Sequence, residues 1–423
     1  MNAIDLDHQA SRESAPRVLI VAGNWWPLSA RMAIALIKHG CNVAALCPPG
    51  HPLRYVNGIS HIYDYKSLSS EQALADAVGD AQPQLIVPCE DRVVLQLHEL
   101  HRNRPDLRSV IERSLGDPRS FEVVAGRADL LWLARDLGIR IPDSERIESA
   151  AQAADCFVRL GPAPVMKVDG SYGGEGVRIV RSTGEAREAF KSMTTLVSLG
   201  TTVKRSIVNS DPLAVWRWRR RHQPELVMQR FVVGIPANIM VACWQGEMLG
   251  HVAVQAVSCQ GITGAANVVR LNANRELVRA AELLTARLGL SGFFGLDFVL
   301  EERTGDAYLI ELNPRCTQLG HLPLAQGDLA GALCARLWGR RAESSAAPVV
   351  SDLVAFFPQA IQWGVREELI KSSYHDVPWE QQSLVAQLLQ VPWPERRFIS
   401  RIYHAFRKPR VLEAIEFRDA IAS

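Results

Sequence analysis

Two carboxylates and an amide in the segment GLDFVLEERTGDAYLIELNPR have the types and spacing to bind a hard metal ion. The apolar runs LDFVL and YLIEL predict a β-hairpin whose loop is centred near Thr304, which makes Asp297 and Glu311 cross-strand partners. Asn313, two residues further on, faces the same side. Oxygen ligands of this kind suit Mg²⁺, whereas without a cation the two carboxylates repel each other. The alternative is a solvated sheet face, which the apolar flanks disfavour.

A glycine-rich segment, DGSYGGEG, connects the β-type runs PVMKV and VRIV. Gly170, Gly173, Gly174 and Gly176 allow positive φ, so that backbone N–H groups can approach phosphate oxygens closely. The segment is not a Walker A loop, because no GK[ST] follows, and a plain mobile β-loop is an equally simple interpretation. Lys167 in the preceding apolar run favours the phosphate interpretation, because a lysine among apolar residues needs an anion nearby.

The elements that must position these residues fall into about three units, as expected for this length. Residues 17–116 alternate short apolar strands with amphipathic helices, which is typical of a parallel sheet covered by helices. The first loop, GNWWPLSA, lacks GxGxxG spacing, which argues against a dinucleotide site. Residues 117–341 alternate helices with antiparallel strand pairs, one of which we expect LVMQRFV and ANIMVACW to form. We expect a disordered tail at 1–16 and a C-terminal extension at 342–423, which begins with the Ala- and Ser-rich linker AESSAAP.

The composition predicts an ordinary soluble globular protein with a small partner. Of 423 residues, 48% are hydrophobic and 22% charged, and the net charge of +2 creates no global field that attracts nucleic acid or anionic membrane. The eight cysteines form no CxxC and no zinc-ligand pattern with histidine, so we expect reduced thiols. Neither a signal peptide nor an apolar run of about 18 residues is present. We therefore expect a cytoplasmic protein without a membrane span.

Three motifs in order resemble the ATP-grasp superfamily: Lys167 with the glycine-rich segment, then VMQRFVVG, then GFFGLDFVL with LIELNPR. The resemblance covers roughly residues 120 to 330, and residues 17 to 115 resemble the α/β domain that usually precedes this fold. It is closest to the branch of carboxylate–amine ligases, carboxylases and carbamoyl-phosphate enzymes. The expected fold class is thus α/β and α+β, with a Rossmann-like parallel-sheet domain followed by a two-lobed ATP-grasp domain.

The resemblance implies that the cofactors are ATP and two Mg²⁺ or Mn²⁺ ions, and it assigns roles to residues of this chain. Asp297, Glu311 and Asn313 would bind the metal, and Lys167 would contact the α- and β-phosphates under the glycine loop. Arg127 stands where the family usually has a first phosphate-binding lysine and keeps the charge with a planar fork geometry.

The remaining roles concern the nucleoside and the transferred group. The backbone of Arg230 and Val232 would line the adenine as a hinge between the lobes, where Gln229 replaces a frequent glutamate; the alternative is a plain core strand. Asn238 would replace the acidic residue that often holds the ribose. Arg315 would stabilise charge on the transferring phosphoryl group, unless it forms a surface salt bridge. Gln318 and His321 would border the acceptor site, although a structural histidine is an equal alternative.

The implied function is an ATP- and Mg-dependent ligase that activates a carboxylate as an acyl phosphate for attack by an amine or another nucleophile. Its partners would be small-molecule carboxylate and amine substrates, and a homo-oligomer is possible. One alternative is a bicarbonate-activating carboxylase-type enzyme, which the lack of a biotin-carrier segment in this chain disfavours. Another is a non-catalytic ATP-binding regulatory protein. Residues 192–224, which end in AVWRWRRRHQPE, are an insertion that could bind an acidic substrate, a carrier protein or membrane lipid, or form a plain surface helix.

Overall fold

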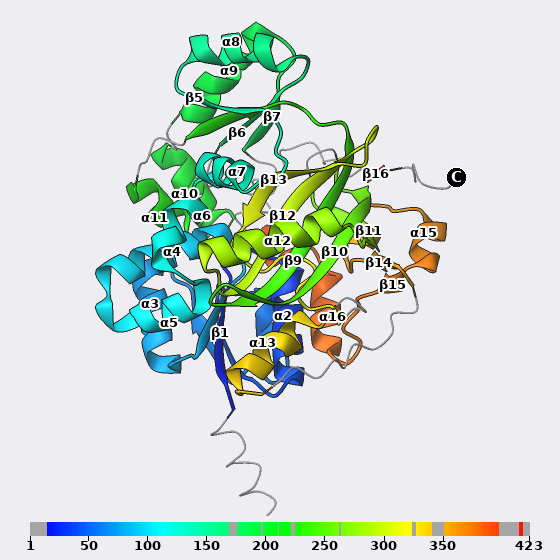
Figure 1. Ribbon diagram of the computed structural model, residues 1–423. Helices are drawn as coiled ribbons and strands as arrows, with labels where there is room; N and C mark the ends of the chain where they lie inside the picture. The colour runs from blue at the N-terminus through cyan, green and yellow to red at the C-terminus, as the bar shows by residue number, and fades with distance from the viewer. Residues whose placement is uncertain are drawn as a thin grey trace, which may run out of the picture.

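The structure is a computed structural model, in which three β-sheets and their helices form an N-terminal domain and two further lobes (Figure 1). The residues that it describes are 15–168, 176–195, 198–209, 211–220, 225–261, 264–323, 327–340, 351–396 and 414–417.

The N-terminal domain is a parallel four-stranded sheet in the order β3-β2-β1-β4, as the alternating sequence pattern predicts. Its strands are β1 (Arg17–Val21), β2 (Asn42–Cys47), β3 (His61–Asp64) and β4 (Leu85–Pro88). Its helices are α2 (Pro27–Lys38), α3 (Ser70–Ala81), α4 (Asp91–Asn103) and α5 (Arg108–Leu115), with 3-10 turns at Pro52–Tyr55 and Pro105–Leu107. Because all four strands are parallel, the loops that follow β1 and β4 meet at the carboxyl ends of the strands. Ligands usually bind at this end of such a sheet.

A small lobe follows, built on an antiparallel sheet in the order β5-β8-β6-β7. A 3-10 turn (Pro118–Ser120) and two helices, α6 (Phe121–Ala125) and α7 (Arg127–Asp136), lead into it. The lobe contains β5 (Ser144–Ile147), α8 (Ala150–Leu160), β6 (Val165–Val168), β7 (Val177–Ile179), α9 (Thr183–Thr194) and β8 (Leu226–Gln229). The insertion supplies α10 (Leu199–Ile207) and α11 (Ala214–Arg220) before β8.

The large lobe is built on a sheet in the order β13-β12-β9-β10-β11-β14-β15, with β16 beside β10. Its main strands and helices are β9 (Gly234–Trp244), β10 (Glu247–Cys259), β11 (Ala266–Leu271), α12 (Arg275–Leu288), β12 (Gly292–Glu301), β13 (Ala307–Asn313) and α13 (Leu329–Leu337). The expected pairing of LVMQRFV with ANIMVACW is wrong, because β8 and β9 belong to different sheets. Residues 230–233 are therefore the connection between the two lobes.

The C-terminal segment extends the sheet of the large lobe. Its elements are β14 (Leu353–Ala355), α14 (Gln359–Gln362), α15 (Glu367–Ser372), β15 (Tyr374–His375), α16 (Gln382–Leu388), α17 (Trp393–Arg396) and β16 (Ile415–Glu416). β14 pairs with β11, and β16 pairs with β10. The predicted linker at 342–348 and the predicted tail, apart from residues 15 and 16, lie outside the described residues.

The hydrophobic cores distinguish one large body from the small lobe. One core joins α2 and one face of the N-terminal sheet to the large-lobe sheet, α13 and α16, and it includes Met32, Met240, Leu333 and Leu384. The core of the small lobe is separate and includes Met166 and Met228. The N-terminal domain thus packs firmly on the large lobe, whereas the small lobe stands apart at the top of Figure 1.

A buried ion pair ties the C-terminal segment to the N-terminal domain. Arg31 on α2 lies 3.2 Å from Asp376, and both side chains are almost fully buried. Asp376 also contacts His321 Nε2 at 3.2 Å and accepts a hydrogen bond from the backbone N–H of Phe357 at 2.6 Å. Burial raises the pKa of Asp376, but Arg31 and His321 more than offset this effect, so the pKa is lowered overall. His321 is therefore part of a structural cluster.

We expect Asp376→Ala to lower the free energy of unfolding by about 3–5 kcal/mol, because it leaves the Arg31 guanidinium buried without its counter-ion. Chemical denaturation followed by fluorescence measures this loss. The control is Glu247→Ala, which breaks an exposed pair with Arg336 and should cost less than about 1 kcal/mol. Equal losses in the two variants would contradict the structural role of Asp376.

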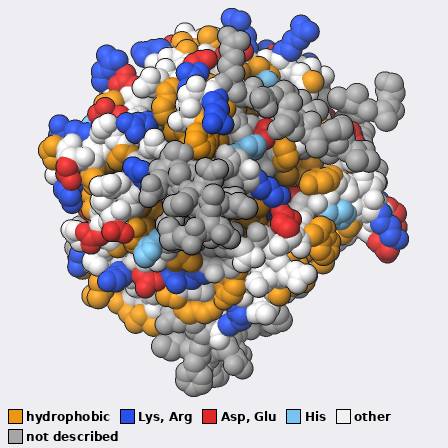
Figure 2. All heavy atoms as spheres, turned by 90° about the horizontal axis from the view of Figure 1, so that it is seen from below, with side chains coloured by type: hydrophobic (Ala, Val, Ile, Leu, Met, Phe, Trp, Pro, Cys, Tyr) orange, Lys and Arg blue, Asp and Glu red, His pale blue; other side chains and the backbone are white. Residues whose placement is uncertain are grey.

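Within the described residues, no helix is both long and apolar enough to span a membrane. On the face shown in Figure 2, the coloured basic and acidic side chains are interspersed. That face carries no broad patch of a single charge among the described residues, in keeping with the small net charge of the chain.

Candidate functional site

The carboxylate pair lies on the hairpin of β12 and β13 with the register that the sequence predicts. Asp297 is opposite Glu311, and Gly295 is opposite Asn313. Asn313 Nδ2 donates a hydrogen bond of 2.8 Å to Asp297 Oδ2, so the amide and the carboxylate share one face. The predicted geometry of these three side chains is confirmed.

Asn238 belongs to the same cluster, and the ribose contact expected of it stays a prediction. β9 pairs with β12 so that Asn238 lies opposite Asp297, and its Nδ2 donates to Asp297 Oδ1 at 2.5 Å. Its Oδ1 is buried and has no hydrogen-bond partner among the described residues. The placement follows from long-range strand pairing, so the short segment GIPANIM gives no sign of it.

The electrostatics of this cluster suit a cation. Burial raises the pKa of Asp297, and the neighbouring charge of Glu311 raises it further, against the opposing effect of the two amides. A divalent cation would relieve that repulsion, and the orphaned Asn238 Oδ1 offers a further oxygen ligand. No group of three or more His, Cys, Asp or Glu side chains with metal-binding geometry occurs in the described part of the chain. The residues fit an oxygen-ligated ion such as Mg²⁺, whose remaining ligands would be phosphate oxygens or water.

Lys167 brings a buried cation from the small lobe toward these carboxylates. It lies on β6 and is 6% exposed, and no hydrogen bond from its ammonium group occurs within the described residues. Burial lowers its pKa to about 7, and Arg127 contributes to the decrease, whereas Glu311 and Asp297 oppose it. An ammonium group so placed gains strongly from a bound anion.

Arg127, at the start of α7, contacts both lobes. Its NH2 lies 2.9 Å from Glu311 Oε2 on β13, and its NH1 donates to the carbonyl of Val168 at the end of β6 at 3.0 Å. The structure thus brings Arg127, Lys167 and the carboxylate pair together, although they come from four elements: α7, β6, β12 and β13. Two cations and two carboxylates meet at the junction of the lobes.

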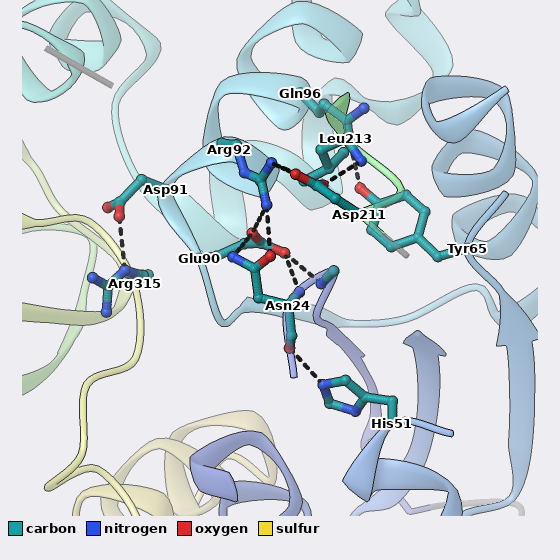
Figure 3. Close-up of polar contacts among 11 residues, drawn as sticks. Asn24, His51, Tyr65, Glu90, Asp91, Arg92, Gln96, Asp211, Leu213 and Arg315 are labelled. Atoms are coloured by element: carbon teal, nitrogen blue, oxygen red, sulfur yellow. Dashed lines mark hydrogen bonds and ion pairs between the residues drawn. The ribbon is translucent and has the colours of Figure 1, made fainter. Parts of the chain in front are cut away.

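Arg315 reaches the cluster from the other side. β13 ends at Asn313, yet Arg315 NH2 turns back to donate to Asn313 Oδ1 at 3.0 Å. Its Nε donates to Asp91 Oδ2 at 3.0 Å, at the first turn of α4 in the N-terminal domain (Figure 3). Asp91 was not predicted from the sequence. Its position in PCEDR, shortly after β4, could have indicated it, because ligand-site residues often follow parallel strands.

The predicted hinge residues lie in the connection between the lobes. Gln229 is buried, and its Nε2 donates to Ser144 Oγ at 3.1 Å. The N–H of Arg230 donates to the carbonyl of Asp143 at 2.8 Å. Val232 is also buried. These contacts hold the connection against β5, and the adenine role stays a prediction.

Two further predictions have different outcomes in the structure. Gly170, Gly173 and Gly174 lie outside the described residues, whereas the carbonyl of Gly176 accepts a hydrogen bond from Val168 N at the end of β6. Gln318 has a buried Nε2 without a partner among the described residues. Its expected role at an acceptor site stays a prediction.

The site lies at the junction of two α+β lobes that follow a parallel-sheet domain, which is the arrangement expected of an ATP-grasp protein. Residues 131–318 match the family model described as "ATP-grasp domain". The chain therefore contains an ATP-grasp domain, as the order of its motifs predicts. No curated protein sequence matches the chain.

Solved structures with the same fold cover most of the chain at low identity. The N5-carboxyaminoimidazole synthase of Aspergillus clavatus, in complex with ADP and 5-aminoimidazole ribonucleotide, has 15% identity and a TM-score of 0.57, with 80% of each chain covered. The biotin carboxylase domain of the Hydrogenobacter thermophilus 2-oxoglutarate carboxylase, with MgADP, ADP and bicarbonate, has 14% identity and a TM-score of 0.55 and covers 77% of this chain and 70% of its own. The N5-carboxyaminoimidazole ribonucleotide synthetase of Thermus thermophilus has 16% identity and a TM-score of 0.54, covering 78% and 80%. The likeness establishes the fold.

Proposed function

We propose that the protein is an ATP- and Mg²⁺-dependent ligase that activates a small-molecule carboxylate as an acyl phosphate for attack by an amine or another nucleophile. The observation that carries this proposal is the meeting of Lys167 and Arg127 with Asp297 and Glu311 between two lobes. Cations suit phosphate oxygens, and an adjacent carboxylate pair suits the metal that accompanies them. The solved structures with ADP, MgADP or ATP share the fold and support this interpretation.

The residues would divide the work as follows. Lys167 and Arg127 would bind the phosphates of ATP from the small-lobe side, and Asp297, Glu311 and Asn313 would hold Mg²⁺ from the large-lobe side. Mg²⁺, when bound, would neutralise developing charge on the phosphoryl oxygens. Arg315 would stabilise charge on the transferred group, because its guanidinium contacts Asn313 from the side of the N-terminal domain. Positioning and electrostatics would supply most of the catalysis.

Adenine would lie along the connection between the lobes. The N–H of Arg230 is already bonded to Asp143, but no described hydrogen bond uses the carbonyl of Arg230 or the N–H of Val232. This acceptor and donor would suit the amino group and the ring nitrogen of adenine. The ribose would lie toward Asn238, whose Nδ2 donates a hydrogen bond to Asp297 and whose Oδ1 has no partner among the described residues.

A nucleotide-release screen tests the proposal. Small carboxylates, including bicarbonate and amino acids, are paired with amines in the presence of MgATP, and ADP, AMP and phosphate are measured. Substrate-dependent release of ADP and phosphate would support acyl phosphate chemistry. AMP and pyrophosphate would indicate adenylation, and tight binding of MgATP without turnover for any pair would favour the regulatory alternative. Both results would contradict the proposed mechanism.

A further inference from the structure

A buried polar network around Glu90 holds the loops at the carboxyl ends of the strands of the N-terminal sheet (Figure 3). Glu90, which follows β4, accepts hydrogen bonds from the backbone N–H groups of Gly23 and Asn24, which follow β1. Asn24 Nδ2 donates to Glu90 Oε2 at 2.9 Å, and the carbonyl of Asn24 contacts His51 Nε2 at 2.8 Å. A Cβ at Gly23 would lie 2.4 Å from Glu90 Oε1, so the two loops touch closely.

Arg92 connects this network to the insertion. Its NH2 lies 2.9 Å from Glu90 and 2.8 Å from Asn24 Oδ1, and its NH1 contacts both carboxylate oxygens of Asp211 at 2.7 and 2.9 Å. Asp211 lies just before α11, and the neighbouring Leu213 packs in a core of the N-terminal domain. This part of the insertion therefore lies at the carboxyl ends of the strands, where a ligand would otherwise be expected.

Asp91 lies between these two anchored residues and extends to the opposite side. Glu90 and Arg92 are buried within the network, whereas the Asp91 carboxylate projects toward the large lobe and meets Arg315 (Figure 3). Because both sequence neighbours are fixed, little freedom remains for the backbone of Asp91. Its carboxylate is thus a rigid acceptor that the N-terminal domain presents to a residue of the large lobe.

The guanidinium of Arg315 is oriented by acceptors on three of its nitrogens. Nε donates to Asp91, NH2 donates to Asn313 Oδ1 in the metal cluster, and NH1 donates to the carbonyl of Cys316 at 3.3 Å. Asn313 and Cys316 are close in sequence to Arg315 and move with it. Asp91 is the one of the three acceptors that belongs to another domain. Planar guanidinium groups are directional, so removing this acceptor frees the side chain to rotate.

We propose that Asp91 is a positioning residue that holds Arg315 in its reactive orientation, and that the N-terminal domain thereby contributes to catalysis. This inference rests on the proposed function, because it needs Arg315 to act on the transferred group. The competing interpretation is an ion pair that only joins two domains. A joining pair would contribute to stability, whereas a positioning pair contributes to kcat.

The test compares Asp91→Asn with the conservative Asp91→Glu, with Arg315→Ala, and with the double variant of Asp91→Asn and Arg315→Ala. The matched control is Asp106→Asn, which removes the same charge from an exposed pair with Arg104 in the same domain. We expect Asp91→Asn to lower kcat for ADP release by about 10- to 100-fold, which is the usual effect of removing a residue that orients a reactive group. The Kd for Mg–AMPPNP should change less than about twofold. Asp91→Glu should restore part of kcat. In the double variant, Asp91→Asn should cause no further loss.

A kcat for Asp91→Asn within twofold of wild type would overturn the positioning role, and so would additive losses in the double variant or an equal weakening of Mg–AMPPNP binding. The contact itself is measured by the ¹H–¹⁵N signal of the Arg315 Nε–H group, assigned by its loss in Arg315→Lys. It should shift in Asp91→Asn and stay fixed in Asp106→Asn, and an unmoved signal would overturn the contact. Failure of the proposed function looks different, because wild type would then bind no Mg–AMPPNP or release no ADP while the Arg315 signal still reported the contact.

Discussion

Glu311→Gln is expected to lower kcat/KM for MgATP-dependent ADP release by about 100-fold while the protein stays folded. The variant keeps the side-chain volume but removes one of two anionic ligands on the β12–β13 hairpin. A loss of about 2.7 kcal/mol of charge stabilisation corresponds to that factor, and metal ions supply several kcal/mol in such reactions. MgATP should also stabilise the variant less against heat, because a ligand with weaker affinity shifts the folding equilibrium less.

The apo protein should change little in stability, because two effects oppose each other. Glutamine loses the charge that pairs with Arg127 at 2.9 Å, but it also removes the like charge that raises the pKa of Asp297. The Arg127 side chain is 9% exposed and that of Glu311 26%, but glutamine can still accept a hydrogen bond from Arg127, whose NH1 keeps its bond to Val168, so the lost charge should cost about 1 kcal/mol. Thermal unfolding with and without MgATP measures both quantities. Glu247→Gln, which changes an exposed pair between β10 of the same sheet and α13, is the control. A thermal shift by MgATP equal to that of wild type would contradict the metal assignment.

Local sequence patterns predicted the parts of this molecule that depend on short-range geometry. The expected position of the loop predicted the pairing of Asp297 with Glu311, whereas the β-bulge between Asp297 and Phe298, where the register shifts, has no sign in the strand pattern. The parallel N-terminal sheet was equally accessible, since alternating apolar strands and helices allow few other arrangements. In both cases the partners are close in sequence or the pattern repeats several times.

The contacts that could not be predicted from the sequence join residues that are far apart along the chain. Asn238 contacts Asp297 because β9 lies beside β12, and Asp91 meets Arg315 across 224 positions of sequence. The allocation of β8 and β9 to different sheets also follows from how the whole chain packs, since either strand alone suits either sheet. Strands as short as β15 and β16, with two residues each, carry no readable pattern.

Lys167 should make nucleotide binding depend on pH. Burial lowers its pKa to about 7, with a smaller contribution from Arg127, whereas the pKa of lysine in an unfolded chain is about 10.4. The unfolded chain therefore binds more protons than the folded apo protein between those pH values, and this residue makes apo stability rise with pH across that window. Bound phosphate reverses the preference, because its negative charge favours the ammonium form.

We therefore expect Mg–AMPPNP binding at pH 8 to take up about one proton, and its affinity to fall by up to about tenfold per pH unit from pH 7.5 to 9.5. Calorimetry in buffers with different ionisation enthalpies measures the proton uptake directly. Lys167→Met should weaken binding by about 10- to 150-fold at pH 7.5, because it removes a charge-assisted contact worth about 1.5–3 kcal/mol. The decisive expectation is that the methionine variant also loses the proton uptake and most of the pH dependence, while Lys191→Ala, on the exposed face of α9, keeps both. Proton uptake that persists in Lys167→Met would show that another group titrates on binding, and the phosphate contact assigned to Lys167 would then be wrong.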